Sequence, residues 1–164
     1  MNKVITESGM SFIADNSFHI EESNLYKGLG KGVRSVEFLR IKDNKLLFIE
    51  AKRSFPNPNN PDIENMERFQ LEIDEVCEKF IHSLNLLFSI EVGVLDSVFE
   101  SDFILPEKIV LEFVLVIKNH EMKWCKLVQD KLTTNLPKYI IKIWKPIVYV
   151  INYENAARWK LIVD

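Results

Sequence analysis

The chain has few of the residues that usually mark a zinc site or a disulfide framework. Among its 164 residues there are two cysteines and three histidines. Cys77 and Cys125 are far apart and fall within expected helices, so we expect two buried free thiols in a reducing compartment. Because no cluster of cysteine and histidine occurs, a zinc site is not expected.

Further absences exclude several classes of protein. No apolar run is long enough to span a membrane, and residues 1–12 lack a signal-peptide core, so we expect a cytoplasmic protein. The sequence contains no Gly-x-Ser-x-Gly and no Walker-type Gly-Lys-Ser/Thr. His19, His82 and His120 have no evident partners for serine-hydrolase chemistry.

The overall composition is that of an ordinary globular domain. Hydrophobic residues make up 47% and charged residues 27% of the chain, and its length suits one domain covering residues 1–164. The net charge of −3 argues against a protein that binds nucleic acid over its whole surface. Lysines are more frequent in the last third, where they form either a local basic patch or scattered solvated charges.

The clearest local signal lies in residues 32–55. Two apolar runs, 36–41 and 46–51, flank the polar residues 42–45. This pattern predicts a β-hairpin with a two-residue turn at Asp43-Asn44. In that register Glu37 lies opposite Glu50.

Alternation along the two strands then decides which side chains share a face. Glu37, Glu50 and Lys52 fall on one face, and the other face takes Val36, Phe38, Leu47, Ile49 and Ala51. Two carboxylates directly opposite one another destabilise a sheet, and near a core they also lose hydration. A divalent cation would offset this cost, because carboxylate oxygens are the ligands that Mg²⁺ prefers. The alternatives are a register slipped by one residue and a strand end at which these charges lie in solvent.

Glu37 followed by Glu50-Ala51-Lys52 resembles the core of the PD-(D/E)xK nuclease-like superfamily. The resemblance covers about residues 18–90, and it departs from the family where Glu37 stands in place of the usual Asp. It implies that Glu37 and Glu50 hold Mg²⁺ or Mn²⁺, while Lys52 positions or activates the attacking water.

The resemblance also implies two auxiliary positions. An additional acidic residue from the preceding element would complete the metal site, and Glu22 and Glu7 are the candidates, with solvated acids as the alternative. A residue on the helix after Glu-x-Lys would assist catalysis, and Gln70 occupies such a position next to an apolar stripe.

Periodicity along the rest of the chain predicts alternating strands and helices. A weakly alternating strand at 17–22 precedes a glycine-rich loop at 26–34, and residues 7–13 suit either a helical turn or a short strand. A long helix starts with Asn60 as its cap and Pro61 in its first turn. Later elements are strands at 109–117 and 147–153, helices at 124–136 and after Pro137, and a short helix at 155–159.

This order predicts an α/β (α+β) fold, with a mixed central sheet flanked by helices in a restriction-endonuclease-like core. With the resemblance, it leads us to expect a Mg²⁺- or Mn²⁺-dependent nuclease that hydrolyses DNA or RNA phosphodiesters. The alternatives are a catalytically inactive scaffold that acts as a binding or regulatory module, and an accidental match. Target recognition would come from a partner protein or a second copy of the chain.

Overall fold

A mixed sheet of five strands, in the order β3-β4-β5-β6-β7, is the centre of the computed structural model, which describes residues 2–163. The strand β4 runs antiparallel to β3 and β5, whereas β5, β6 and β7 are parallel. This confirms the prediction of an α/β fold with a mixed sheet. The bounds are Ser17–Phe18 for β3, Phe38–Lys42 for β4, Lys45–Lys52 for β5, Val110–Ile117 for β6 and Ile147–Asn152 for β7.

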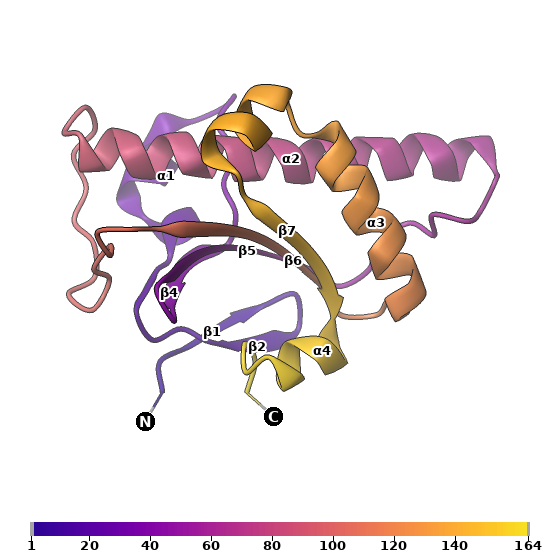
Figure 1. Ribbon diagram of the computed structural model, residues 1–164, viewed down its shortest axis with the longest axis horizontal. Coiled ribbons are helices and arrows are strands. Elements are labelled where there is room, and N and C mark those ends of the chain that lie inside the picture. Colours follow the sequence, from indigo (N-terminus) through magenta and orange to yellow (C-terminus); the bar gives the residue numbers. More distant parts are fainter. Residues whose placement is uncertain (1, 164) are drawn as a thin grey trace.

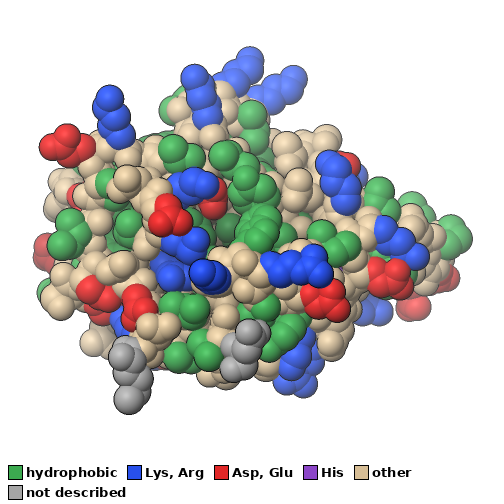
Figure 2. Space-filling view, turned by 60° about the horizontal axis from the view of Figure 1, so that its bottom comes forward, with side chains coloured by type: hydrophobic (Ala, Val, Ile, Leu, Met, Phe, Trp, Pro, Cys, Tyr) green, Lys and Arg blue, Asp and Glu red, His purple; other side chains and the backbone are tan. Residues whose placement is uncertain are grey.

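Helices and a small hairpin cover opposite faces of this sheet (Figure 1). On one face lie α2 (Ile63–Glu91) and α3 (Met122–Asn135), which bury the larger apolar core against the strands. On the other face lie the hairpin of β1 (Val4–Glu7) and β2 (Met10–Ile13) and the short helix α4 (Tyr153–Arg158), around a second core. Lysine and arginine side chains gather near the middle of that second face (Figure 2).

The predicted hairpin of β4 and β5 is confirmed in its register and its turn. Lys42 lies opposite Lys45, and Leu39 lies opposite Phe48. Asp43 and Asn44 form the turn with φ angles of 51° and 60°. Both angles are in the left-handed region that a two-residue type I′ hairpin requires and that Asp and Asn tolerate better than most residues.

The register breaks at Glu37, one residue before β4 begins. The ladder ends with Phe38 opposite Ile49, and the Glu37 N–H donates instead to the Ile49 carbonyl at 3.1 Å. Val36 packs in the core under the helices, whereas Phe38 packs in the core under the hairpin. The prediction that Val36 and Phe38 share a face is therefore wrong, because alternation is interrupted at the residue between them.

Two local predictions before the long helix are also corrected, and the strand alternative is confirmed for a third segment. The strand expected at 17–22 stops at Phe18 and continues as a 3₁₀ turn, η1 (Ile20–Glu22). The loop expected at 26–34 begins within a short helix, α1 (Asn24–Leu29), whose first turn is capped by the Ser23 hydroxyl. The ambiguous segment 7–13 belongs to the β1–β2 hairpin.

The cap of α2 is Asp62 rather than Asn60. The Asp62 carboxylate accepts from the Asn65 N–H at 3.2 Å, while the Asn60 side chain accepts from the Asp62 N–H at 3.0 Å. Asn60 thus stabilises the turn that precedes the helix, and this leaves the capping position to the acid two residues later.

The later elements follow the predictions closely. The apolar run at 109–117 is β6, which is buried from Leu111 to Ile117 between two parallel neighbours. The helical piece after Pro137 is a π-helix, η2 (Ile140–Trp144). Cys77 and Cys125 lie in α2 and α3 as buried free thiols. No helix in residues 2–163 has the length and apolarity needed to cross a membrane.

Candidate functional site

Two buried carboxylates lie at the end of the β4–β5 hairpin away from the turn, but Glu37 does not pair with Glu50 across the ladder as the predicted register requires. Glu37 is 7% exposed and Glu50 is 1% exposed. Among the described residues, the Oε2 atom of each has no hydrogen-bond partner. A buried carboxylate oxygen without a partner is costly, so these two atoms mark a place where a ligand or a proton is needed.

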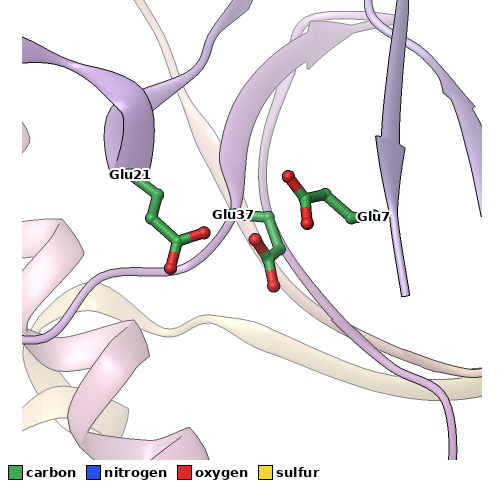
Figure 3. A group of neighbouring side chains, drawn as sticks. All are labelled: Glu7, Glu21 and Glu37. Carbon is green, nitrogen blue, oxygen red and sulfur yellow. The ribbon is translucent and has the colours of Figure 1, made fainter. Parts of the chain in front are cut away.

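Two further glutamates complete an acidic cluster, defined here as Glu7, Glu21 and Glu37 (Figure 3). One carboxylate oxygen from each lies within 4.8 Å of the other two. Glu37 lies between its two neighbours, which come from η1 on one side and from β1 on the other (Figure 3). His19 Nε2 also lies 3.6 Å from Glu7 Oε1, so this histidine does have an acidic partner.

The structure brings Glu7 to the cluster but not Glu22. Glu22 is exposed, and its carboxylate pairs with Lys27 Nζ at 2.6 Å. The prediction followed the two-residue period of a strand, whereas these residues form a 3₁₀ turn with a period of about three residues, so Ile20 and Glu22 do not share a face. Glu21 therefore takes the place that the sequence analysis gave to Glu22.

Burial determines the protonation of the two inner carboxyls. The pKa of Glu37 is raised to about 10, mainly by burial and in addition by the neighbouring carboxyl groups of Glu21 and Glu50. Burial also raises the pKa of Glu50, to about 7, against the opposing effect of Lys79. Near neutral pH without a cation, Glu37 therefore holds a proton.

The amine beside Glu50 belongs to Lys79 of α2, not to Lys52. Lys79 Nζ lies 2.6 Å from Glu50 Oε1, and this pair is largely buried. Lys52 Nζ instead contacts two acids of α2, Glu72 at 3.0 Å and Glu75 at 3.2 Å. Lys79 is not among the residues predicted from the sequence, although its position beside the buried Phe80 on the apolar stripe of α2 was the available signal.

Gln70 lies away from the acidic cluster. Its side-chain amide donates to Asp74 at 2.8 Å and to Asn135 of α3 at 3.3 Å. These contacts join α2 to α3. The predicted position beside the apolar stripe is correct: the neighbouring Phe69 packs against Phe55, which follows β5, but the Gln70 amide itself contacts α3.

The donor set fits a hard divalent cation. It consists of carboxylate oxygens only, and one of them, the buried Glu37 Oε2, has no partner in the described chain. Mg²⁺ and Mn²⁺ favour such oxygen ligands. Lys52 and Lys79 place positive charge at the same end of the sheet, so the arrangement combines metal ligands, a titrating carboxyl and two amines.

Comparisons with protein-family models, with curated proteins and with solved structures found no match to this chain.

Proposed function

We propose that this chain is a Mg²⁺- or Mn²⁺-dependent phosphodiesterase that acts on nucleic acid, with Glu37, Glu21 and Glu7 as metal ligands. The observation that carries the proposal is the state of Glu37. Its carboxyl is buried, lacks a partner for one oxygen and faces two further carboxylates within 4.8 Å. A cation would satisfy all three features at once, and the Glu-x-Lys motif next to it suggests phosphodiester chemistry.

Each residue of the site has a role that its surroundings support. The bound ion would polarise the phosphate and lower the pKa of a water molecule. Glu50 has a pKa of about 7, which is the range that suits a general base, and its Oε2 atom is free to take a proton among the described residues. Lys79 holds the opposite oxygen of that carboxyl in place at 2.6 Å.

Lys52 would stabilise the negative charge that develops on the phosphate. Its amine now pairs with Glu72 and Glu75, and both acids are partly exposed. Lys52 can exchange these contacts for a phosphate oxygen, because both acids keep access to solvent when the amine leaves them.

A second candidate function is the inactive scaffold, in which the same fold binds a partner without catalysis. The observation that favours it is the internal pairing of the lysines. Lys79 neutralises Glu50, and Lys52 is held by two acids of α2 whose charge opposes the approach of phosphate. In that case the cluster would be a structural cation site at most.

The test compares matched glutamates in a Mn²⁺ titration by calorimetry. We expect wild type and Glu22→Gln to bind Mn²⁺ equally, because Glu22 lies outside the cluster, and we expect Glu21→Gln and Glu37→Gln to lose binding. Single-stranded and duplex oligonucleotides of DNA and RNA would then be incubated with wild type and Lys52→Ala.

Each outcome separates the two candidates. Cleavage by wild type that is lost in Lys52→Ala supports the phosphodiesterase. Mn²⁺ binding without cleavage of any of these substrates supports the scaffold. Mn²⁺ binding that survives in both cluster variants contradicts the assigned metal site.

A further inference from the structure

A cleft of about 660 Å³ lies at the same end of the sheet as the acidic cluster, at the carboxyl ends of β6 and β7. In parallel sheets, ligands commonly bind beyond these ends. A volume of this size suits a nucleotide-sized ligand. The lining residues that matter here are Gly9, Lys118, His120, Trp124 and Tyr153.

The cleft adjoins the acidic cluster through the turn between β1 and β2. Glu7 on one side of this turn belongs to the cluster, and Gly9 on the other side lines the cleft. The Ser8 hydroxyl donates to the Ala51 carbonyl at 3.0 Å and so fixes the turn to β5. The Lys118 N–H donates to the Lys52 carbonyl at 2.9 Å. One extended ligand can therefore reach from the cleft to the end of β5.

An aromatic surface and an unpartnered polar atom lie together in the cleft. Trp124 is partly exposed, and its ring lies 5.2 Å from the imidazole of His120. His120 is 8% exposed, and its Nε2 atom has no hydrogen-bond partner among the described residues. Burial lowers the pKa of His120, so the imidazole is neutral. It therefore places no positive charge beside a nucleic-acid base bound in the cleft. Lys123 Nζ lies 5.6 Å from the centre of the Trp124 ring.

Two cations meet at the end of the cleft that is closest to the acidic cluster. A Cβ atom built on Gly9 would lie 3.1 Å from Lys118 Nζ and 3.3 Å from the Arg53 guanidinium, so both charges lie against this glycine. Within residues 2–163, neither Arg53 nor Lys118 pairs with a carboxylate. The Lys118 amine donates to the Gly9 carbonyl at 2.8 Å, which leaves its charge in place. Two adjacent cations that no described carboxylate neutralises favour an anionic ligand. Glu121 and Glu154 also line the cleft, and their charge disfavours phosphate away from Lys118 and Arg53.

We propose that this cleft binds one nucleotide of a single-stranded nucleic acid, with the base stacked on Trp124 and the phosphate held by Lys118 and Arg53. The proposal rests on the proposed function, since it identifies the substrate as single-stranded and places a base beside the scissile phosphate. Stacking on an aromatic side chain requires an exposed base face, which a duplex does not offer. It is also largely independent of sequence, because every base has a π-face.

The experiment measures binding of a fluorescent deoxythymidine 10-mer by anisotropy in EDTA, so that neither metal nor cleavage contributes. We expect Trp124→Leu to weaken binding by on the order of ten-fold, in line with the stacking energy of one base. Trp159→Leu is the control, because Trp159 also reaches the surface but packs on Tyr149 at the opposite ends of the strands. Its binding should equal that of wild type, and Trp124→Tyr should retain most of the affinity. A duplex of the same length should bind more weakly than the single strand.

A second measurement protects the test against misfolded variants. In the double variant Trp144→Phe/Trp159→Phe, the remaining tryptophan is Trp124, and the 10-mer should quench its fluorescence. Equal binding by wild type and Trp124→Leu, or no quenching at saturating 10-mer, would overturn the proposal.

The metal-site variant separates this inference from the proposed function. Glu37→Gln should bind the 10-mer in EDTA as wild type does, even where it no longer binds Mn²⁺. Binding that depends on Trp124 without any cleavage activity would support the nucleotide site in the cleft and refute the phosphodiesterase. Cleavage that does not depend on Trp124 would support the phosphodiesterase and refute the nucleotide site.

Discussion

The substitution Glu37→Gln tests the central feature of the site, the proton that the buried carboxyl holds. The pKa of Glu37 is raised from 4.5 to about 10. Between these two values the folded state keeps a proton that the unfolded state releases. The contribution of Glu37 to the free energy of unfolding must therefore fall as pH rises through this window, and it is fully present below about pH 4.5. Glu50, with a pKa raised to about 7, adds a decrease in the same direction between pH 4.5 and 7.

The magnitude follows from the width of the window. One proton taken up on folding changes the free energy of unfolding by at most about 1.4 kcal/mol per pH unit. Between pH 4.5 and pH 8 this gives an upper limit of about 5 kcal/mol for Glu37. Glutamine has almost the same shape and no titrating proton, so Glu37→Gln should match wild type at pH 5 and exceed its stability by about 2–5 kcal/mol at pH 8.

The assay is urea unfolding in EDTA at several values between pH 5 and pH 8, with Glu22→Gln as the control. Addition of Mn²⁺ at pH 8 should stabilise wild type, by about 2.7 kcal/mol at one hundred times its dissociation constant, and should leave Glu37→Gln unchanged. A wild type whose stability is constant or rises over this range, or a Glu37→Gln curve parallel to that of wild type, would refute the reasoning about Glu37.

Three further predictions concern the same region and its core. The affinity for Mn²⁺ should rise by up to about ten-fold per pH unit between pH 6 and pH 8, because the ion displaces the proton on Glu37; calorimetry in two buffers of different ionisation enthalpy would report that proton. Lys79→Met should destabilise by roughly 3–5 kcal/mol at pH 8, because it leaves Glu50 buried without its counter-charge, and by less at pH 5, as urea unfolding at both pH values would show. Phe80→Ala should cost about 3–5 kcal/mol at either pH, because Phe80 is fully buried and stacks on Phe113 at 4.7 Å.

The parts of the fold that were predictable have strong local patterns. The β4–β5 hairpin follows from two apolar runs around Asp43-Asn44, whose residue types tolerate the positive φ angles of the turn. The strand β6 follows from a continuous β-branched run, and α2 follows from apolar residues spaced three or four apart. In each case the nearest neighbours in sequence provide most of the information.

The missed features depend on contacts between distant segments. The strands β1 and β2 have four residues each, too few for alternation to stand out from chance. The choice between Glu21 and Glu22 depends on a 3₁₀ turn that follows a strand of two residues. Lys79 meets Glu50 only because α2 crosses the sheet there, and no spacing rule connects two residues that are 29 positions apart. The register predicts Glu37 opposite Glu50, but the interruption before Phe38 instead turns Glu37 toward Glu21 and Glu7.

The balance of charge at this end of the sheet makes phosphate binding depend on the cation. The acidic cluster and Glu50 outnumber Lys52 and Lys79, and α2 adds Glu72 and Glu75 against Lys52. Without a cation, protonation of Glu37 removes one of these negative charges, but the remaining carboxylates still oppose a phosphate. A divalent ion replaces the proton and so makes the same position more positive by one charge. Nucleic acid held by Trp124, Lys118 and Arg53 would then be drawn to the end of β5 only when the ion is present. Binding at the cleft should therefore persist in EDTA, while engagement of the acidic cluster should require the metal.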